Sequence, residues 1–425
     1  MNYKQTLEFI NSFLVFGSKP GLNRIDELLT MLDNPQQKLK IIHVAGTNGK
    51  GSVCSYINTV LTGAGYKTGM YISPYVNDFR ERITINGEFI SENELIALIE
   101  YIKPFLEKMT EQITEFELLT AAAFYYYHIN NCDFVVLETG LGGRFDATNI
   151  IPVPLVSVIT SISFDHMQYL GDTLEKIAFE KSGIIKENGI TVYYPIQDEA
   201  AFRVISESAL KLGNAIITPD LNELKIVNQT ICENKIEYKK IKLDIPLIGE
   251  HQVYNCITAV EALKALSKYG YIINDNIISE SIRKTFVPSR FEKISDNPVV
   301  IIDGAHNEDA IHQFSKSLEC LLPNKKIIVI MGMLRDKEYL PSITHMAKNA
   351  AYFIAVTPLN ERALPASDTK KIAENYCTAI AVNTYGKAVK SAIIKQREIA
   401  DSIIAVCGSL FITGEIKDEF ISNTI

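Results

Sequence analysis

The stretch GTNGKGS at residues 46–52 contains the residue types that bind phosphate groups. An apolar run at 40–46 leads into it, and an apolar stripe with helical spacing follows from residue 52 to 63. In such a strand-to-helix turn the backbone N–H groups and the helix start point at one place, and glycine lets a phosphate approach closely. Lys50 could reach the outer phosphates of a nucleotide. We therefore predict a nucleotide site; the alternative is a plain turn with a solvated lysine.

This stretch departs from the standard P-loop pattern G-x-x-x-x-G-K-[ST] at two positions. The pattern requires glycine where Val44 stands, and serine or threonine where Gly51 stands. In that pattern the hydroxyl after the lysine contacts Mg²⁺. If the stretch binds a magnesium nucleotide, another segment must supply the hydroxyl, and Ser73 is our candidate.

Polar residues follow three other apolar runs. Ser73 follows the run at 67–72, Glu138 follows 133–137, and Asp165 and His166 follow 155–163. Parallel strands bring their carboxyl ends to one edge of a sheet, where ligands bind. Mg²⁺ prefers oxygen ligands, which serine and glutamate supply; a histidine is less usual and could act through water. We predict a magnesium site at this edge, although each residue alone could be a turn or a buried, hydrogen-bonded side chain.

The elements that position these residues are short β-branched runs that alternate with helical patterns. This alternation is typical of a buried parallel sheet with crossover helices. Residues 190–248 instead have short alternating runs, which predict hairpins at a sheet edge or an inserted subdomain. Two prolines at 286–298 precede a new strand, so we place a domain boundary there and expect domains 1–288 and 289–425. The apolar runs lie at 40–46, 67–73, 133–140 and 154–163 in the first part, and at 298–307, 326–333, 351–358 and 402–409 in the second.

Composition and charge exclude several classes of protein. A chain of 425 residues with 47% apolar and 22% charged residues is typical of a soluble protein of two or three domains. We find no N-terminal signal and no apolar run of the roughly 18 residues that a membrane span needs. Seven scattered cysteines without a C-x-x-C pair indicate a reducing cytoplasm, and a net charge of −8 disfavours nucleic-acid binding.

Further polar residues attract attention, but no chemistry follows from them alone. Arg80 and Arg82 could grip an anionic substrate or form a solvated charge cluster. Lys181 ends a predicted helix and is by itself an ordinary lysine. The remaining residues are Asp146 in a glycine-rich loop, His251 and Asn255 four apart at a helix start, and Asp303 and His306 at a strand end.

Taken in order, these motifs resemble the folylpolyglutamate synthase/dihydrofolate synthase family of Mur-type ATP-dependent ligases. The resemblance spans residues 45–416, nearly the whole chain. The matching pieces are VAGTNGKGSV, YISPY, ERITING, TEFELLTAAAF, LETGLGGRFDATN, TSISFDH, EKSGII, GEHQVYN, PSRFE, IDGAHN, GMLRDK and VCGSLFITGEI.

The resemblance implies an α/β protein with an N-terminal P-loop-like, doubly wound domain of the Mur ligase central type. A smaller Rossmann-like C-terminal domain follows, with the active site between the two. It implies ATP-driven amide formation, through an acyl phosphate, between L-glutamate and the carboxylate of dihydropteroate or a (tetrahydro)folate. We expect both activities, two Mg²⁺ ions and a monomer in the cytoplasm, with no nucleic-acid or membrane partner.

The resemblance also implies residue roles. ATP would be bound by Thr47, Asn48, Gly49, Lys50, Gly51, Ser52, Asn255, Arg290 and Asp303. Mg²⁺ would be held by Ser73, Glu138, His166 and Lys181, the last as a carbamylated lysine; Lys50, Lys181 and His306 are the catalytic candidates. The substrate would meet Lys19, Pro20, Gly21, Arg80, Arg82, Thr114, Glu115, Phe116, Glu117, Phe145, Asp146 and Ala147.

Two other functions are compatible with parts of the sequence. The first is a Mur-type ligase for a muramyl or cyanophycin-like substrate, against which LETGLGGRFDATN and ERITING argue. The second is a nucleotide-dependent switch or transport ATPase that shares only the phosphate loop.

Overall fold

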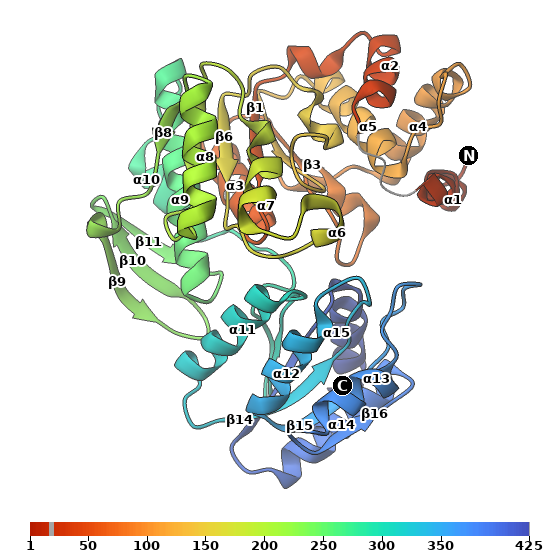
Figure 1. Ribbon diagram of the computed structural model, residues 1–425, viewed down its shortest axis with the longest axis vertical. Coiled ribbons are helices and arrows are strands. Elements are labelled where there is room, and N and C mark those ends of the chain that lie inside the picture. Colours follow the sequence, from red (N-terminus) through yellow and green to blue (C-terminus); the bar gives the residue numbers. More distant parts are fainter. Residues whose placement is uncertain (17–20, 425) are drawn as a thin grey trace.

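The chain forms two sheets, one in each half of the sequence (Figure 1). This computed structural model describes residues 1–16 and 21–424. The N-terminal sheet has eight strands in the order β4-β3-β2-β5-β1-β6-β7-β8, and the C-terminal sheet has six in the order β12-β13-β17-β14-β15-β16. The predicted α/β class, with a larger doubly wound sheet followed by a smaller one, is confirmed.

The middle of the larger sheet is formed by three parallel, fully buried strands. They are β5 (Phe134–Glu138), β1 (Ile41–Ala45) and β6 (Val156–Ile159). Burial on both faces explains why their sequences are continuous apolar runs rather than alternating ones. Their carboxyl ends meet at one edge, as predicted. The parallel strands β2 (Thr68–Tyr71), β7 (Ile190–Tyr193) and β8 (Ala215–Ile217) and the antiparallel strands β3 (Ile83–Ile85) and β4 (Glu88–Phe89) complete the sheet.

Helices cover both faces of this sheet. Alternate residues of β1 divide between two cores, with Ile42 and Val44 on one side and Ile41 on the other. The first core contains α3 (Lys50–Gly63), α9 (Glu250–Ala265) and α10 (Asp275–Ile282). The second contains α1 (Tyr3–Asn11), α2 (Asn23–Met31), α4 (Glu92–Leu106) and α5 (Glu115–Ile129), and a third lies under α7 (Leu174–Lys181) and α8 (Glu199–Lys211).

The region 190–248 is only partly what the sequence predicts. Its first part, through residue 217, is β7, α8 and β8, which continue the parallel sheet. The hairpin prediction is wrong there because β7 is buried on both faces, so its polar Thr191 does not mark a solvent side. It is confirmed for β9 (Leu224–Gln229), β10 (Asn234–Tyr238) and β11 (Ile241–Ile245), an antiparallel sheet at the side of the larger domain (Figure 1).

The second sheet repeats the parallel arrangement with one antiparallel edge strand. We place the domain boundary near residue 288, within the segment that joins α10 to β12. The strands are β12 (Glu292–Asp296), β13 (Val299–Ile302), β14 (Lys326–Met331), β15 (Ala350–Ala355), β16 (Ala379–Ala381) and β17 (Ser402–Cys407). One face packs on α11 (Glu308–Leu321), α12 (Tyr339–Asn349) and α13 (Ala366–Ala373), the other on α14 (Tyr385–Glu398) and α15 (Leu410–Thr424).

In the described part of the chain, no helix combines the length and the apolar character needed to cross a bilayer. All seven cysteines are free thiols.

The capping boxes that start α4 and α5 allow a matched test of burial. Ser91 caps α4 at the surface, whereas Thr114 caps α5 in the interior, where its partner Glu117 also binds Arg24 at 3.0 Å. We expect Ser91→Ala to lower the free energy of unfolding by about 1 kcal/mol. Thr114→Ala should lower it by about 2–3 kcal/mol, because the buried Glu117 loses a hydroxyl donor. Urea unfolding followed by circular dichroism measures both; equal losses would contradict this reading.

Candidate functional site

A cavity of about 460 Å³ lies at the carboxyl edge of the central strands and is closed by the second domain. Both domains therefore contribute to its wall. Every residue predicted to bind ATP or metal, and every catalytic candidate, lines it. These are Thr47, Asn48, Gly49, Lys50, Gly51, Ser52, Ser73, Glu138, His166, Lys181, Asn255, Arg290, Asp303 and His306.

The glycine-rich loop between β1 and α3 is anchored to the segment that follows β6. The Thr47 amide donates to the Ser161 carbonyl at 2.7 Å. The Thr47 hydroxyl donates to the Ser163 carbonyl at 3.0 Å and accepts from the Ser163 amide at 3.1 Å. These bonds fix the loop without using its glycine amides, which stay available to a phosphate.

Two lysine ammonium groups meet at the start of this loop. Lys50 donates to the carbonyls of Gly46 at 3.2 Å and Thr47 at 3.1 Å, and its Nζ lies 4.0 Å from Glu138 Oε1. Lys181, at the end of α7, donates to the same Gly46 carbonyl at 2.6 Å. Burial and the nearby Lys50 lower the pKa of Lys181 to about 7. Near neutral pH a substantial part of Lys181 is therefore the uncharged amine.

The predicted metal ligands lie where the strand-end argument places them. Glu138 is buried, and burial raises the pKa of its carboxyl although Lys50 opposes this. It accepts a long hydrogen bond from the Ser73 amide at 3.3 Å, and its Oε1 lies 4.0 Å from Lys50 Nζ. A buried carboxylate with so little compensation suits a bound cation.

His166 has the form that a metal ligand needs. Burial and the Lys337 ammonium lower the pKa of its imidazole to about 4, so the ring is neutral at physiological pH. Among the described residues no three His, Cys, Asp or Glu side chains converge to hold a metal by themselves. Mg²⁺ does not require such a cage, because it keeps waters and takes oxygens from bound phosphates.

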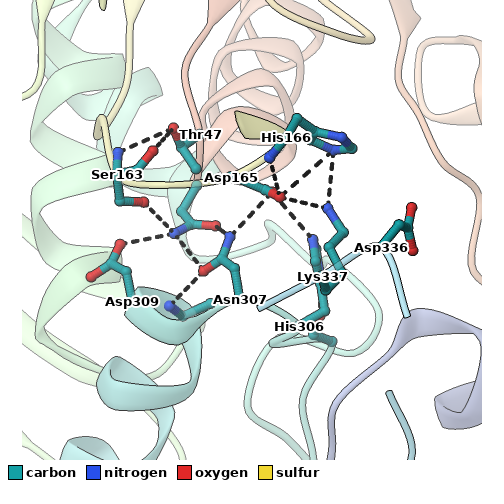
Figure 2. A network of polar contacts seen from close by, with 12 residues as sticks. Thr47, Ser163, Asp165, His166, His306, Asn307, Asp309, Asp336 and Lys337 are labelled. Carbon is teal, nitrogen blue, oxygen red and sulfur yellow. Dashed lines mark hydrogen bonds and ion pairs between the residues drawn. The ribbon is translucent and has the colours of Figure 1, made fainter. Parts of the chain in front are cut away.

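Polar contacts tie the phosphate loop directly to the second domain (Figure 2). The amides of Asn48 and Asn307 exchange two hydrogen bonds of 3.2 and 3.0 Å. Asn48 also donates to Asp309 Oδ2 at 2.8 Å. Asn307 is the N-cap of α11, so this helix begins at the loop that is expected to hold phosphate.

Asp165 is the centre of the second group of interdomain contacts (Figure 2). It accepts a hydrogen bond from Lys337 Nζ at 2.7 Å and lies 3.8 Å from His166 and 3.9 Å from His306. Burial opposes its charge, yet Lys337 and the two histidines hold the pKa of its carboxyl well below the usual range. Burial and Lys337 lower the pKa of His306 to about 4.

Sequence reasoning missed four residues of this network as site residues. Asp165 follows the predicted strand at 155–163, as His166 does, but it was not predicted to be a metal ligand. Lys337 follows β14 in the motif GMLRDK, so the same rule, applied to the second sheet, could have identified it. Asn307 and Asp309 at the start of α11 showed no signal of contact with another domain.

The second domain also shapes its own part of the cavity through Asp303. Its carboxylate accepts hydrogen bonds from the amides of Phe291 and Ala305, each at 2.7 Å. Burial raises the pKa of this carboxyl, and Arg290 opposes the shift. Asp303 thereby holds the segment that presents Arg290 to the cavity.

Of the residues predicted along the substrate pocket, those that the structure describes do not line this cavity. Arg82 and Glu115 form a buried ion pair with each other, and Arg80 pairs with Asp78 at 2.6 Å. Thr114 and Glu117 form the capping box described above. The other placements are Phe116 over Gly140, Phe145 exposed, Ala147 buried and Gly21 with a φ of +129°; Lys19 and Pro20 lie outside the described residues. Their contact with substrate stays a prediction.

Asp146 has a structural role in the glycine-rich loop after β5. Its carboxylate accepts from the amides of Leu141 at 2.7 Å and Thr148 at 3.0 Å. The loop packs on α7, where a Cβ on Gly143 would come within 2.7 Å of the Lys181 carbonyl. Asp146 thus helps to hold the loop against the helix that ends in Lys181.

The chain is similar to known proteins over nearly its whole length. The Mur ligase middle domain family matches residues 44–263, and the Mur ligase glutamate ligase domain matches 289–410. The dihydrofolate synthase/folylpolyglutamate synthase of Bacillus subtilis is 35% identical, with 98% of each chain covered. Folylpolyglutamate synthase of Mycobacterium tuberculosis, complexed with ADP and AMPPCP, has a TM-score of 0.88 at 26% identity, covering 99% of each chain. E. coli FolC in complex with DHPP and ADP has a TM-score of 0.89 at 25% identity, covering 100% of this chain and 99% of the other.

Two glycines of the loop provide a test of its role. Gly49 has a φ of +86°, and a Cβ there would lie 2.4 Å from Asn255 Oδ1. Gly51 has no positive φ, and its Cβ would lie 3.7 Å from the nearest atom, in Glu138. We expect Gly49→Ala to weaken ADP binding at least about tenfold, or 1.4 kcal/mol, in isothermal titration calorimetry. Gly51→Ala is the control and should stay within about threefold. Similar affinities of the two variants would contradict the assignment of the loop.

Proposed function

Since the chain belongs to the folylpolyglutamate synthase/dihydrofolate synthase family of Mur ligases, we propose that it adds L-glutamate to two acceptors, dihydropteroate and a reduced folate, at one site. The ATP-dependent ligation is the activity that this family shares. One observation carries the proposal. A single cavity between the domains contains a phosphate loop, a buried carboxylate with a neutral histidine, and the Arg290–Asp303 junction.

The reaction needs ATP because a carboxylate has a poor leaving group. Transfer of the ATP γ-phosphoryl group to an acceptor carboxylate oxygen gives an acyl phosphate and ADP. The amino group of glutamate then attacks the acyl carbon, phosphate leaves, and the amide forms with loss of a proton. The protein's contribution to the first step is positioning and the neutralisation of charge. This explains why cations gather at one point of a chain with a net charge of −8.

Each group of cavity residues has a part in this scheme. The amides of the loop 46–52 bind the phosphates, and Lys50 neutralises charge on the group that is transferred. Ser73, Glu138 and His166 would hold Mg²⁺, with a second ion nearby. The ion, when bound, withdraws charge from the phosphate oxygens. Asn255 and Arg290 would hold the nucleotide from opposite sides of the cavity.

Lys181 fits the proposed carbamylation. Its amine would add to CO₂, forming an N–C bond and releasing one proton, and the product is a carboxylate that can bind metal. The reaction requires the uncharged amine, and the pKa of about 7 supplies it at neutral pH. Carbamylation also removes a buried positive charge next to Lys50.

We also propose that the protein works as a monomer in the cytoplasm. One copy suffices because its own two domains complete the cavity. Free thiols at all seven cysteines suit a reducing compartment.

Lys50→Ala tests the phosphate role and the choice of acceptors together. With ATP and glutamate, the wild type should convert both dihydropteroate and tetrahydrofolate, with products resolved by mass. The variant should lose about 10³-fold or more in kcat/KM for each, because the charge opposite the transferred group is gone. The control is Lys326→Ala, because Lys326 is exposed and begins β14, at the end of this strand that lies away from the cavity. Wild-type turnover of one acceptor alone would refute the dual activity, and ADP release without acceptor or glutamate would favour a nucleotide switch.

The state of Lys181 can be observed by ¹³C NMR with labelled bicarbonate. At constant dissolved CO₂, a carbamate signal should grow between pH 6 and pH 8, because the amine fraction rises through a pKa of about 7. The signal should vanish in Lys181→Ala and persist in Lys186→Ala, a control lysine whose pKa burial also lowers. Full activity of CO₂-depleted enzyme with an unmodified Lys181 would overturn the carbamylation.

A further inference from the structure

Lys337 is a buried ammonium that reaches from the second domain into the proposed metal site. It lies on the segment between β14 and α12, and only 8% of its side chain is exposed. Its Nζ is 2.7 Å from Asp165 Oδ1 and 3.0 Å from His166 Nε2 (Figure 2). Both partners belong to the first domain.

Chemistry fixes the direction of the contact with His166. An ammonium has donors and no acceptor, so Nε2 must present its lone pair to Lys337. With a donor at Nε2, the proton of the neutral ring lies on Nδ1. A neutral imidazole with a free Nε2 lone pair is also the form that binds metal. Lys337 and a metal ion therefore require the same lone pair.

We propose that Lys337 is a placeholder cation, which occupies His166 in the metal-free protein and must leave when a divalent ion binds there. This inference rests on the proposed metal site. Metal binding at His166 and the Lys337 contact between the domains then exclude each other. Binding of the ion would break the Lys337–His166 contact and leave Asp165 as the partner of Lys337 in the first domain.

The charges around His166 support the same displacement. Besides Lys337, the Lys50 ammonium lies close to this site, with its Nζ 4.0 Å from Glu138 Oε1. The carboxylates nearby are the buried Glu138 and Asp165, whose side chain is 11% exposed. A divalent ion added beside Lys50 and Lys337 would leave excess positive charge at a poorly solvated site, and departure of Lys337 reduces it.

Competition predicts that removing the ammonium strengthens metal binding. The probe is Mn²⁺ alone, with the nucleotide-free full chain, measured from the free-ion signal in electron paramagnetic resonance. We expect Lys337→Met to lower the dissociation constant at least tenfold relative to wild type. Lys325→Met is the matched control, because it breaks an exposed ion pair with Asp401 in the same domain and should have no effect.

Two further comparisons separate competition from simple charge removal. The gain from Lys337→Met should persist in an Asp165→Asn background and be lost in a His166→Ala background. A gain that vanishes with Asp165→Asn would overturn the proposal, since it would come from the uncovered carboxylate. Equal or weaker binding by Lys337→Met than by wild type would also overturn it. Lys337→Gln serves if the methionine variant does not fold. Absence of Mn²⁺ binding in every variant would overturn the metal site itself, a failure distinct from loss of the competition alone.

Discussion

The structure depends on the concentration of positive charge at one buried point between two domains. Lys50, Lys181 and Lys337 converge there, and the buried carboxylates of Glu138 and Asp165 face them. Ammonium groups out of water are costly unless anions compensate them. Ion pairs between the domains offset this cost, and the lowered pKa of Lys181 reduces its positive charge. The positive potential that remains favours the phosphates of ATP. The same concentration of lysines therefore destabilises the free protein and attracts the nucleotide.

The parallel topology of both sheets makes this concentration possible. In the first domain, β1, β5 and β6 bring the phosphate loop, Glu138 and Asp165 to one edge. In the second domain, β13 and β14 bring Asp303 and Lys337 to the edge that faces it. Glu138 and Asp303 lie directly at strand ends, whereas Asp165 and Lys337 lie on the segments that follow β6 and β14. The domains meet carboxyl edge to carboxyl edge, and the cavity lies between them.

Much of this site was predictable from the sequence, for a definite reason. Buried parallel strands are continuous apolar runs, so their ends are visible, and Ser73, Glu138 and His166 follow from them. Lys337 was missed because the strand-end rule was not extended to the segment after β14, and the start of α11 was missed because docking between domains leaves no periodic signal in the sequence. The strand at 190–193 was missed because it is short and because its polar Thr191 is buried, so its alternation does not mark a solvent face. Glu117 illustrates another limit: the sequence alone does not show that its carboxylate closes a capping box and binds Arg24.

The exchange of hydrogen bonds between Asn48 and Asn307 also bears on the chemical ageing of the protein. Asn48 precedes Gly49, and Asn-Gly pairs deamidate when the glycine amide nitrogen attacks the side-chain carbonyl carbon and expels ammonia. That attack needs a freely rotating side chain. Here the Asn48 amide is held by Asn307 and Asp309. The closed arrangement of the domains therefore shields the phosphate loop from a spontaneous reaction that would place a negative charge where phosphate must bind.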